Sequence, residues 1–329
     1  MTVRRTVRWI HTILVAALLA AGSLASLAAD YPSQTVKVVV PFAAGGGVDV
    51  VARIIVPPLS ASLGQSIVIE NRGGAGGALG ASAVAQAAAD GYTLLLGTGS
   101  THGTNSSVYA KLSYDPARDF APIALVTSSP LVLVANPTVP AKTAKELITL
   151  AKSKPDELAF GSYGTGSINH LAAELLNSMA GIQTNHVPYR GSAPMMTDLI
   201  GGRIQFAFDG VATSLGYIQG GKVNMLGISG TKRSPIHPDE PTISESAVPG
   251  FDATVWFGLF APAGTPKAVV DMLNSKLNAV LTNPVVKAGL LRLGLEPAGG
   301  GSDVLAAKVR SEMQKWAKLV REKNIRIEQ

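Results

Sequence analysis

The regular alternation of strand-like and helix-like segments is the feature that most constrains the fold of this chain. The segment Thr35–Phe42 is rich in β-branched residues, as a buried parallel strand should be. Three glycines at 45–47 follow it, and a helical pattern then runs from Val48 to Leu63. The same order of strand, glycine-rich turn and helix recurs along the chain. Repeated βαβ units of this kind predict an α/β fold with mainly parallel sheets and helices on both faces.

The remaining segments divide into two similar halves. Further strands are expected at 66–70, 92–97, 131–135, 158–161, 186–189, 204–208, 224–229 and 254–261, and further helices at 78–89, 144–152, 169–179, 266–281, 284–293 and 302–323. Long extended segments near 120–130 and 250–262 connect the halves. They predict two lobes joined by a double-crossover hinge. We expect residues 30–128 and 254–329 to form lobe 1, and residues 129–253 to form lobe 2.

Residues 1–29 have the pattern of a cleavable export signal. Three arginines among the first eight residues precede an apolar run from Ile13 to Ala21. Ser26 and Ala28 then supply the small residues that precede a cleavage site. A retained membrane anchor is the alternative, but the apolar run is shorter than the roughly 20 residues needed to span a bilayer. We therefore expect cleavage after Ala28, or one residue later, and an exported, soluble mature protein.

Composition excludes several classes of function. Cysteine is absent, which excludes thiol nucleophiles, thiolate metal sites and disulfides. Without the three arginines of the signal, 25 basic residues stand against 22 acidic ones. The densest basic run, 308–326, contains Glu312 and Glu322, and it predicts the solvated face of an amphipathic helix. Nucleic-acid binding needs an unbalanced basic stripe instead, so we expect no nucleic-acid partner.

Three glycine-rich turns at strand ends form the candidate functional site: 41–49, 97–103 and 160–167. Ligands of open α/β sheets bind beyond the carboxyl ends of the strands. Glycine lets the backbone approach a ligand closely, and a helix N-terminus adds free N–H donors and partial positive charge. Three or four hydrogen bonds to a charged group, at about 1.5–3 kcal/mol each, approach the ~8 kcal/mol of a micromolar complex. These turns therefore predict a carboxylate clamped between the lobes without an obligatory arginine.

The signatures of catalysis are weak. Gly216–Lys222 has the spacing of a phosphate-binding loop, but Val223 replaces the Ser or Thr that would bind magnesium. Neither GxSxG nor HExxH occurs. His170 follows Ser162 and Ser167 closely, which leaves a secreted serine hydrolase as an alternative to a structural or pocket-lining histidine. We expect no metal and no cofactor.

Several charged residues have structural and functional interpretations. Asp49 and Arg53 are spaced i,i+4 in a first helical turn, so capping and ion pairing are expected. Arg72 and Arg190 are weaker candidates for contact with a carboxylate. Asp209 ends a predicted strand, where a ligand group would be met.

The same segments resemble the Bug family, the periplasmic substrate-binding receptors of tripartite tricarboxylate transporters. The stretches that carry the resemblance are PFAAGGGVDVVAR (41–53), ENRGGAGGALGA (70–81), FGSYGTGSINHLAAELL (160–176), HVPYRGSAPMMTDLIGGRIQFAFD (186–209) and LFAPAGTP (259–266). The similarity covers essentially the whole mature chain. It implies a two-lobed type II periplasmic binding-protein fold of the Venus-flytrap kind. It also implies a non-enzymatic receptor that binds a carboxylate through backbone amides and bridging waters and delivers it to an inner-membrane permease.

Carried over by position, the resemblance places the ligand against residues of two turns and nearby strand ends: Phe42, Ala43, Ala44, Gly47, Ser100, Ser162, Thr165, Gly166, Ser167, Tyr189 and Asp209. Gly73 stands where the family often has proline, a difference expected to affect loop stiffness. Tyr163 stands where smaller residues are common, and it is expected to narrow the pocket or to stack on a ring. The expected protein is a monomer that binds a di- or tricarboxylate, an acidic amino acid or an aromatic acid. A ligand sensor that docks on a membrane kinase is the alternative.

Overall fold

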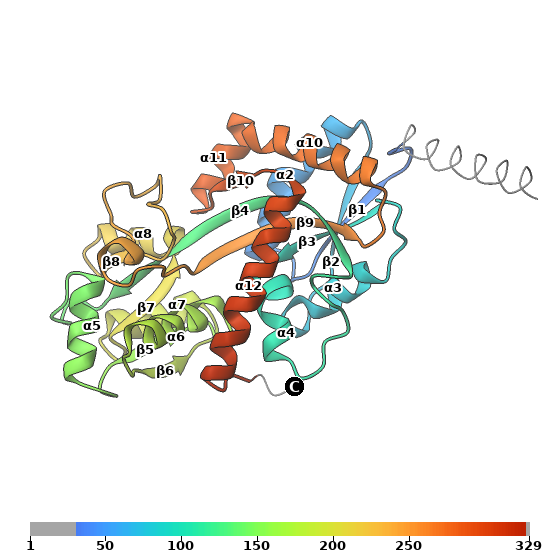
Figure 1. Cartoon of the computed structure of the whole chain (residues 1–329). Helices are drawn as coiled ribbons and strands as arrows, with labels where there is room; N and C mark the ends of the chain where they lie inside the picture. Colours follow the sequence, from blue (N-terminus) through green and yellow to red (C-terminus); the bar gives the residue numbers. More distant parts are fainter. Residues whose placement is uncertain (1–30, 327–329) are drawn as a thin grey trace, which may run out of the picture.

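The computed structural model describes residues 31–326, so the predicted signal at 1–29 lies outside the described residues. Two groups of strands and helices lie side by side and are joined by two long strands (Figure 1). The first group contains β1 (Val36–Val40), α2 (Gly47–Leu63), β2 (Ile67–Asn71), α3 (Ala78–Ala85), β3 (Thr93–Thr98), α4 (Asn105–Val108), α10 (Lys267–Thr282), α11 (Pro284–Arg292) and β10 (Pro297–Gly299). The second contains α5 (Ala144–Ser153), β5 (Ala159–Ser162), α6 (Ile168–Ala180), β6 (Asn185–Pro188), α7 (Ser192–Ile200), β7 (Phe206–Gly210), α8 (Val211–Gln219), β8 (Asn224–Ile228) and α9 (Ile243–Ser246).

The connecting strands are β4 (Phe120–Ala135) and β9 (Thr254–Pro262), which pair antiparallel from Phe120 to Pro130 of β4. Both correspond to the extended segments expected to form a double crossover. The strand order is β2-β1-β3-β9-β4-β7-β5-β6, and β8 and β10 also pair with β4. In Figure 1, β4 and β9 run together from one group into the other.

The sheet is mixed, which corrects the expectation of mainly parallel sheets. β1 pairs parallel with β2 and β3, and β5 pairs parallel with β6 and β7. These are the βαβ units predicted from the sequence. Every pairing of β4 and β9 is antiparallel, because the two strands carry the chain between the groups in opposite directions.

Helix ends follow the local sequence closely. α2 ends at Gly64, whose φ of 71° is the left-handed conformation that glycine adopts without steric cost. α6 begins after Ser167, whose hydroxyl accepts a hydrogen bond from the His170 N–H. The glycine-rich turns therefore deliver the starts of α2 and α6 to the ends of β1 and β5.

The long helix α12 (Ser302–Glu322) contributes to the cores of both groups. Leu305 and Val309 pack in a hydrophobic cluster with residues of β3 and β9. Trp316 and Leu319 pack in a different cluster, which contains the core residues of β4, β5 and α6. In Figure 1 this helix crosses from one group to the other. α12 is therefore a third physical link between them, besides β4 and β9.

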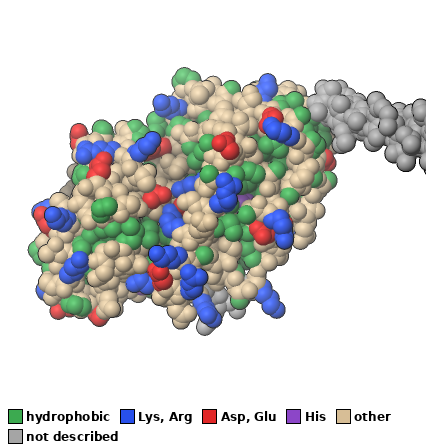
Figure 2. Space-filling model, in the orientation of Figure 1, with side chains coloured by type: hydrophobic (Ala, Val, Ile, Leu, Met, Phe, Trp, Pro, Cys, Tyr) green, Lys and Arg blue, Asp and Glu red, His purple; other side chains and the backbone are tan. Residues whose placement is uncertain are grey.

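The charged run on α12 is only partly solvated, which corrects the expectation for residues 308–326. Lys and Arg side chains lie along this helix on the face shown in Figure 2. Glu312, however, is only 1% exposed. Its carboxylate accepts hydrogen bonds from Lys308 Nζ at 3.1 Å, Lys315 Nζ at 2.6 Å and Trp316 Nε1 at 2.7 Å. The pattern of charged residues predicted that Glu312 is solvated, whereas the packing of α12 against β4 buries its carboxylate and leaves Lys308 and Lys315 partly exposed.

Within residues 31–326, no helix combines the length and the apolar character that a bilayer crossing requires.

Candidate functional site

A cleft lies between the two groups, beyond the strand ends where the glycine-rich turns begin. Its larger part has a volume of about 470 Å³ and is lined by the first turn, the third turn and the start of α6, among others by Gly45, Gly47, Tyr163 and Asn169. Its smaller part, of about 110 Å³, is lined among others by Phe42 and Ser100. Ile168, Val255 and Phe257 line both parts, so the two are neighbouring regions of one cleft.

Asp49 holds the first turn in place. Its carboxylate accepts hydrogen bonds from the Gly45 N–H at 2.9 Å, Arg53 Nε at 2.8 Å and Asn71 Nδ2 at 2.9 Å. Asp49 is 1% exposed, whereas most of the Arg53 side chain is in solvent. The hydrogen bond from Arg53, followed by that from Gly45, lowers the pKa of Asp49 to about 2. The predicted ion pair is confirmed, and its effect is to shape the backbone of the turn.

The third turn is held by uncharged groups. Ser162 Oγ lies 2.6 Å from His186 Nε2, and the His186 ring stacks on His170 with centroids 3.9 Å apart. His170 Nδ1 accepts a hydrogen bond from the Gly166 N–H at 3.1 Å. Burial lowers the pKa of His170 to about 3, with a further contribution from His186, and burial lowers the pKa of His186 to about 4. Both rings are therefore neutral at pH 7.

This geometry contradicts the hydrolase interpretation of the third turn. Ser162 contacts His186 and not His170, and it is 0% exposed, so a substrate cannot reach its hydroxyl. The Ser167 hydroxyl donates to the Gly164 carbonyl at 2.7 Å and caps α6. The sequence suggested His170 because of its proximity along the chain, whereas the parallel pairing of β5 with β6 brings His186 to Ser162.

Asp209, at the end of β7, is completely buried among hydroxyl groups. Thr213 Oγ1 donates to it at 2.9 Å, Ser214 Oγ at 2.7 Å, and Ser192 Oγ lies 3.3 Å from both carboxylate oxygens. The Tyr163 hydroxyl also donates to Asp209. Burial, followed by the charge of Asp209, raises the pKa of the Tyr163 phenol, which therefore remains a donor.

The structure distributes the eleven predicted ligand residues unevenly. Phe42, Gly47 and Ser100 line the cleft. The other eight do not belong to the lining of its two parts: Ala43, Ala44, Ser162, Thr165, Gly166, Ser167, Tyr189 and Asp209. Of these, Ala43, Ala44 and Thr165 are exposed on the two turns. The Tyr189 hydroxyl donates to Asp198 at 2.9 Å.

Among the lining residues that the sequence did not anticipate, three offer polar groups to a ligand. Arg292, at the end of α11, lines the larger part of the cleft, whereas Arg72 and Arg190 line neither part. Asn169 Oδ1 and Trp256 Nε1 are buried without a hydrogen-bond partner in the described part of the chain, and both residues line the cleft. Arg292 follows an ordinary helical pattern, so no local signal distinguishes it. Asn169 and Trp256 could be recognised only from the structure, because it takes the complete set of hydrogen bonds to show that their polar atoms have no partner.

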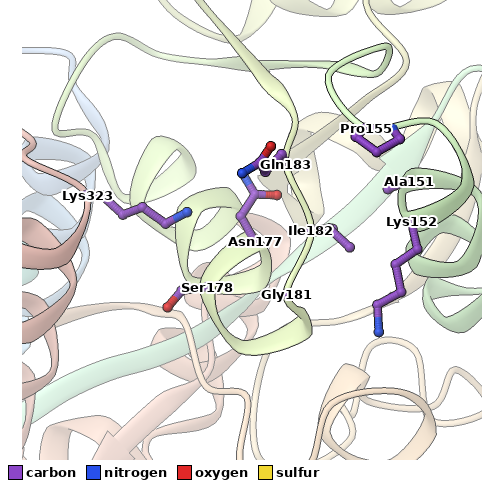
Figure 3. A pocket seen from close by; sticks show the side chains of 9 residues that line it. All are labelled: Ala151, Lys152, Pro155, Asn177, Ser178, Gly181, Ile182, Gln183 and Lys323. Atoms are coloured by element: carbon purple, nitrogen blue, oxygen red, sulfur yellow. The ribbon is translucent and has the colours of Figure 1, made fainter.

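Another cavity, of about 490 Å³, lies away from the predicted turns, between α5, α6 and the end of α12 (Figure 3). Its side chains include Lys152, Asn177 and Lys323, and the two lysines extend in different directions in Figure 3. Lys323 Nζ already lies 3.5 Å from the Glu174 carboxylate. No glycine-rich turn contributes to this lining, so the cleft between the groups is the stronger candidate.

A family model described as the tripartite tricarboxylate transporter family receptor matches residues 51–325. The chain belongs to this family. Protein BugT of Bordetella pertussis is 37% identical over 304 residues, which cover 92% of this chain and 93% of BugT. The resemblance to Bug proteins is thereby confirmed.

Solved structures agree with this assignment. The Rpa4515 protein of Rhodopseudomonas palustris with adipate has a TM-score of 0.75 and 38% identity, over 90% of this chain and 99% of that one. MatC from the same species, with bound malate, has a TM-score of 0.72 and 38% identity, over 88% of this chain and all of that one. The periplasmic binding protein BugD has a TM-score of 0.71 and 37% identity, over 90% of this chain and 99% of that one.

These likenesses establish the two-lobed type II α/β fold that the sequence predicted. The family consists of periplasmic solute-binding receptors and not of enzymes, which sets aside the hydrolase alternative.

Proposed function

We propose that this receptor captures a small carboxylate in the cleft between its two groups and delivers it to a membrane permease. The observation that carries the proposal is the position of the cleft, where turns of both groups and the hinge strands converge on one space. Structural neighbours at 38% identity hold adipate and malate, both small dicarboxylates.

The cleft offers polar groups suited to such a ligand. Arg292 supplies a positive charge, and Trp256 Nε1 supplies a buried N–H donor without a partner among the described residues. Thr165 lies outside the lining described above, and in this proposal closure of the lobes brings its exposed hydroxyl and the backbone amides of the two turns to the ligand. Hydrogen bonds to a charged group contribute about 1.5–3 kcal/mol each, so a few of them give micromolar affinity.

Binding is expected to move two lobes together. In this proposal residues 30–128 and 254–329 form one lobe, residues 129–253 form the other, and β4 and β9 form the hinge. A ligand held by both turns favours the closed form and shifts the population toward it. The mature protein acts as a monomer in the periplasm after removal of the N-terminal signal by cleavage after Ala28 or one residue later.

Thermal unfolding and X-ray scattering with adipate and malate as probes test this proposal. A 100-fold excess over the dissociation constant stabilises a protein by about 2.7 kcal/mol. We expect a higher melting temperature together with a smaller radius of gyration. Stabilisation without compaction would contradict the clamp, and no stabilisation by either probe or by other carboxylates would contradict the function.

Substitutions then test which groups bind the carboxylate. Thr165→Val and Ser167→Ala are expected to weaken binding more than Arg72→Ala, each by about 1–3 kcal/mol in calorimetric titration. Arg72→Ala changes only long-range electrostatics, which salt screens. Because Ser167 also caps α6, its variant needs a parallel stability measurement. Loss of binding in Arg72→Ala or Arg190→Ala, with both hydroxyl variants unaffected, would contradict recognition by backbone and hydroxyl donors.

A further inference from the structure

Asp209 is the one carboxylate that the sequence placed in the ligand pocket, yet the structure surrounds it with hydroxyl groups of the protein. Tyr163, Ser192, Thr213 and Ser214 all lie within hydrogen-bond distance of its two oxygens. An ionised carboxylate offers about four acceptor positions. The four hydroxyls occupy them, and no part of Asp209 is exposed. A ligand cation or hydroxyl reaches Asp209 only by displacing one of these donors.

Tyr163 is the member of this set that separates Asp209 from the middle of the cleft. It belongs to the lining of the larger cavity, while its hydroxyl bonds to Asp209 behind it. Thr213 also lines this cavity, but its hydroxyl is shared between Asp209 and the Gly210 carbonyl, each at 2.9 Å. Ser192 and Ser214 lie outside the lining. The Tyr163 ring therefore lies between the cleft and Asp209. A smaller residue at position 163 would leave the Asp209 carboxylate accessible to a ligand.

The charge of the other lining residues also disfavours a ligand with an ammonium group. Among the described residues that line the larger cavity, none is acidic, and Arg292 is the one basic residue. Most of the others are apolar, including Leu131, Ile168, Val255 and Phe257. An ammonium group enclosed here would lose its hydration without gaining a counter-charge, which is costly in a site of low polarity. A carboxylate at Arg292 with an apolar body meets no such penalty.

We propose that this cleft selects carboxylates whose body is apolar and carries no ammonium group, and that Tyr163 determines this selectivity by closing Asp209 off from the ligand. The inference rests on the proposed carboxylate-binding function and narrows it. Of the ligand classes expected from the sequence, it favours aliphatic dicarboxylates and aromatic acids over acidic amino acids.

Matched pairs of probes that differ by one amino group test the selectivity in the mature protein. The pairs are glutarate and glutamate, adipate and 2-aminoadipate, and 3-phenylpropanoate and phenylalanine. Affinity is measured by calorimetric titration at pH 7. We expect the probe without the amino group to bind at least about tenfold more tightly in every pair that binds, a ratio that corresponds to about 1.4 kcal/mol.

Tyr163→Ala tests whether the ring is responsible. Removing it exposes Asp209 to the cleft, so the amino-bearing probe gains affinity and the ratio within each pair falls by at least about fivefold. Tyr217→Ala is the matched control, because Tyr217 is a partly exposed tyrosine on α8 that does not line the cavity. The control is expected to keep the wild-type ratio.

Three outcomes distinguish the claims. Wild-type protein that binds amino acids as tightly as their partners without the amino group overturns the selectivity and leaves the carboxylate receptor intact. An unchanged ratio in a folded Tyr163→Ala protein overturns the role assigned to Tyr163. Absence of binding by all six probes, and by malate, contradicts the proposed function itself.

Discussion

The two turns that approach the cleft are held by opposite kinds of electrostatics. In the first turn, Asp49 is charged and gains its stability from Arg53, a backbone N–H and Asn71. Beside the third turn, the buried His170 and the half-buried His186 form a stacked neutral pair. Both arrangements fix a glycine-rich backbone at the start of a helix. The difference shows that one structural task is performed by a group that must stay ionised on one side and by groups that must stay neutral on the other.

Asp209 combines features of both turns, because it is a carboxylate like Asp49 but is held by neutral groups, as the third turn is. Like Asp49 it is a buried carboxylate, but every hydrogen bond assigned to it comes from a hydroxyl and none from a cation. Hydroxyl donors spread the charge over several neutral groups, so this network links the turn after β5, α7 and α8 without an ion pair. Its stability therefore depends on the number of donors present.

The largest expected effect comes from removing this acceptor. Asp209→Ala leaves four hydroxyls, including that of the buried Ser214, without their shared acceptor, and we expect a loss of about 3–4 kcal/mol in the free energy of unfolding. Ser214→Ala, which removes a single 2.7 Å donor, should cost about 1–2 kcal/mol. Ser192→Ala should cost less, since its contacts are 3.3 Å. Urea denaturation measures the series, and equal losses in all three variants would contradict the network.

The neutral histidine pair predicts a loss of stability in mild acid. Both folded pKa values lie below the ordinary value of 6.5, so the unfolded chain takes up protons first as the pH falls. The contribution of the neutral histidine pair to the free energy of unfolding is complete above pH 6.5 and decreases toward pH 4. His186→Gln, which keeps a polar partner for Ser162 without titrating, should reduce this loss by about 1–2 kcal/mol after allowance for solvent screening. An unchanged pH profile between 6.5 and 4 would show that the rings are already solvated.

Asp49 should respond in a different pH window. Its folded pKa of about 2 lies below the ordinary value of 3.8, so its contribution is complete above about pH 4 and is lost as the pH falls toward 2. Asp49→Asn should lower the free energy of unfolding by about 1–2 kcal/mol at pH 7. In urea denaturation, the difference in this free energy between the variant and the wild type should become smaller below pH 4. Asp271→Asn is the matched control, because it removes an exposed i,i+4 pair with Lys267. We expect that control to change stability by at most about 0.5 kcal/mol.

The smallest effect is expected at Gly73, which packs against the first turn. A Cβ at this position would lie 3.2 Å from the Ala43 nitrogen and 3.3 Å from the Phe42 carbonyl carbon. The added methyl group of Gly73→Ala should therefore crowd the backbone of the first turn and lower the free energy of unfolding by up to about 1 kcal/mol. Thermal unfolding with and without adipate would separate a stability effect from a binding effect. A loss above about 2 kcal/mol would mean that the first turn is more rigid than this comparison assumes.

The elements nearest the cleft show what local pattern was able to predict. The run of β-branched residues correctly located β1, β5 lies where the strand at 158–161 was expected, and the glycine-rich turns correctly marked the starts of α2 and α6. The pair Asp49 and Arg53 was found because it is local, four residues apart on one helix. α8 was not anticipated, since Val211–Gln219 contains two small polar residues and a glycine in place of a clear apolar repeat.

The sequence by itself determined the alternating α/β architecture, the crossover strands and the position of the turns, because these depend on periodicity and on residues close together in the chain. Only the tertiary structure decided which side chains those turns bring together. Ser162 meets His186 across β5 and β6, Tyr163 closes over Asp209 from 46 positions away, and Arg292 reaches the cleft from α11. The physical reason is that strand pairing and helix packing set these contacts, and neither is encoded in the spacing of the residues that meet.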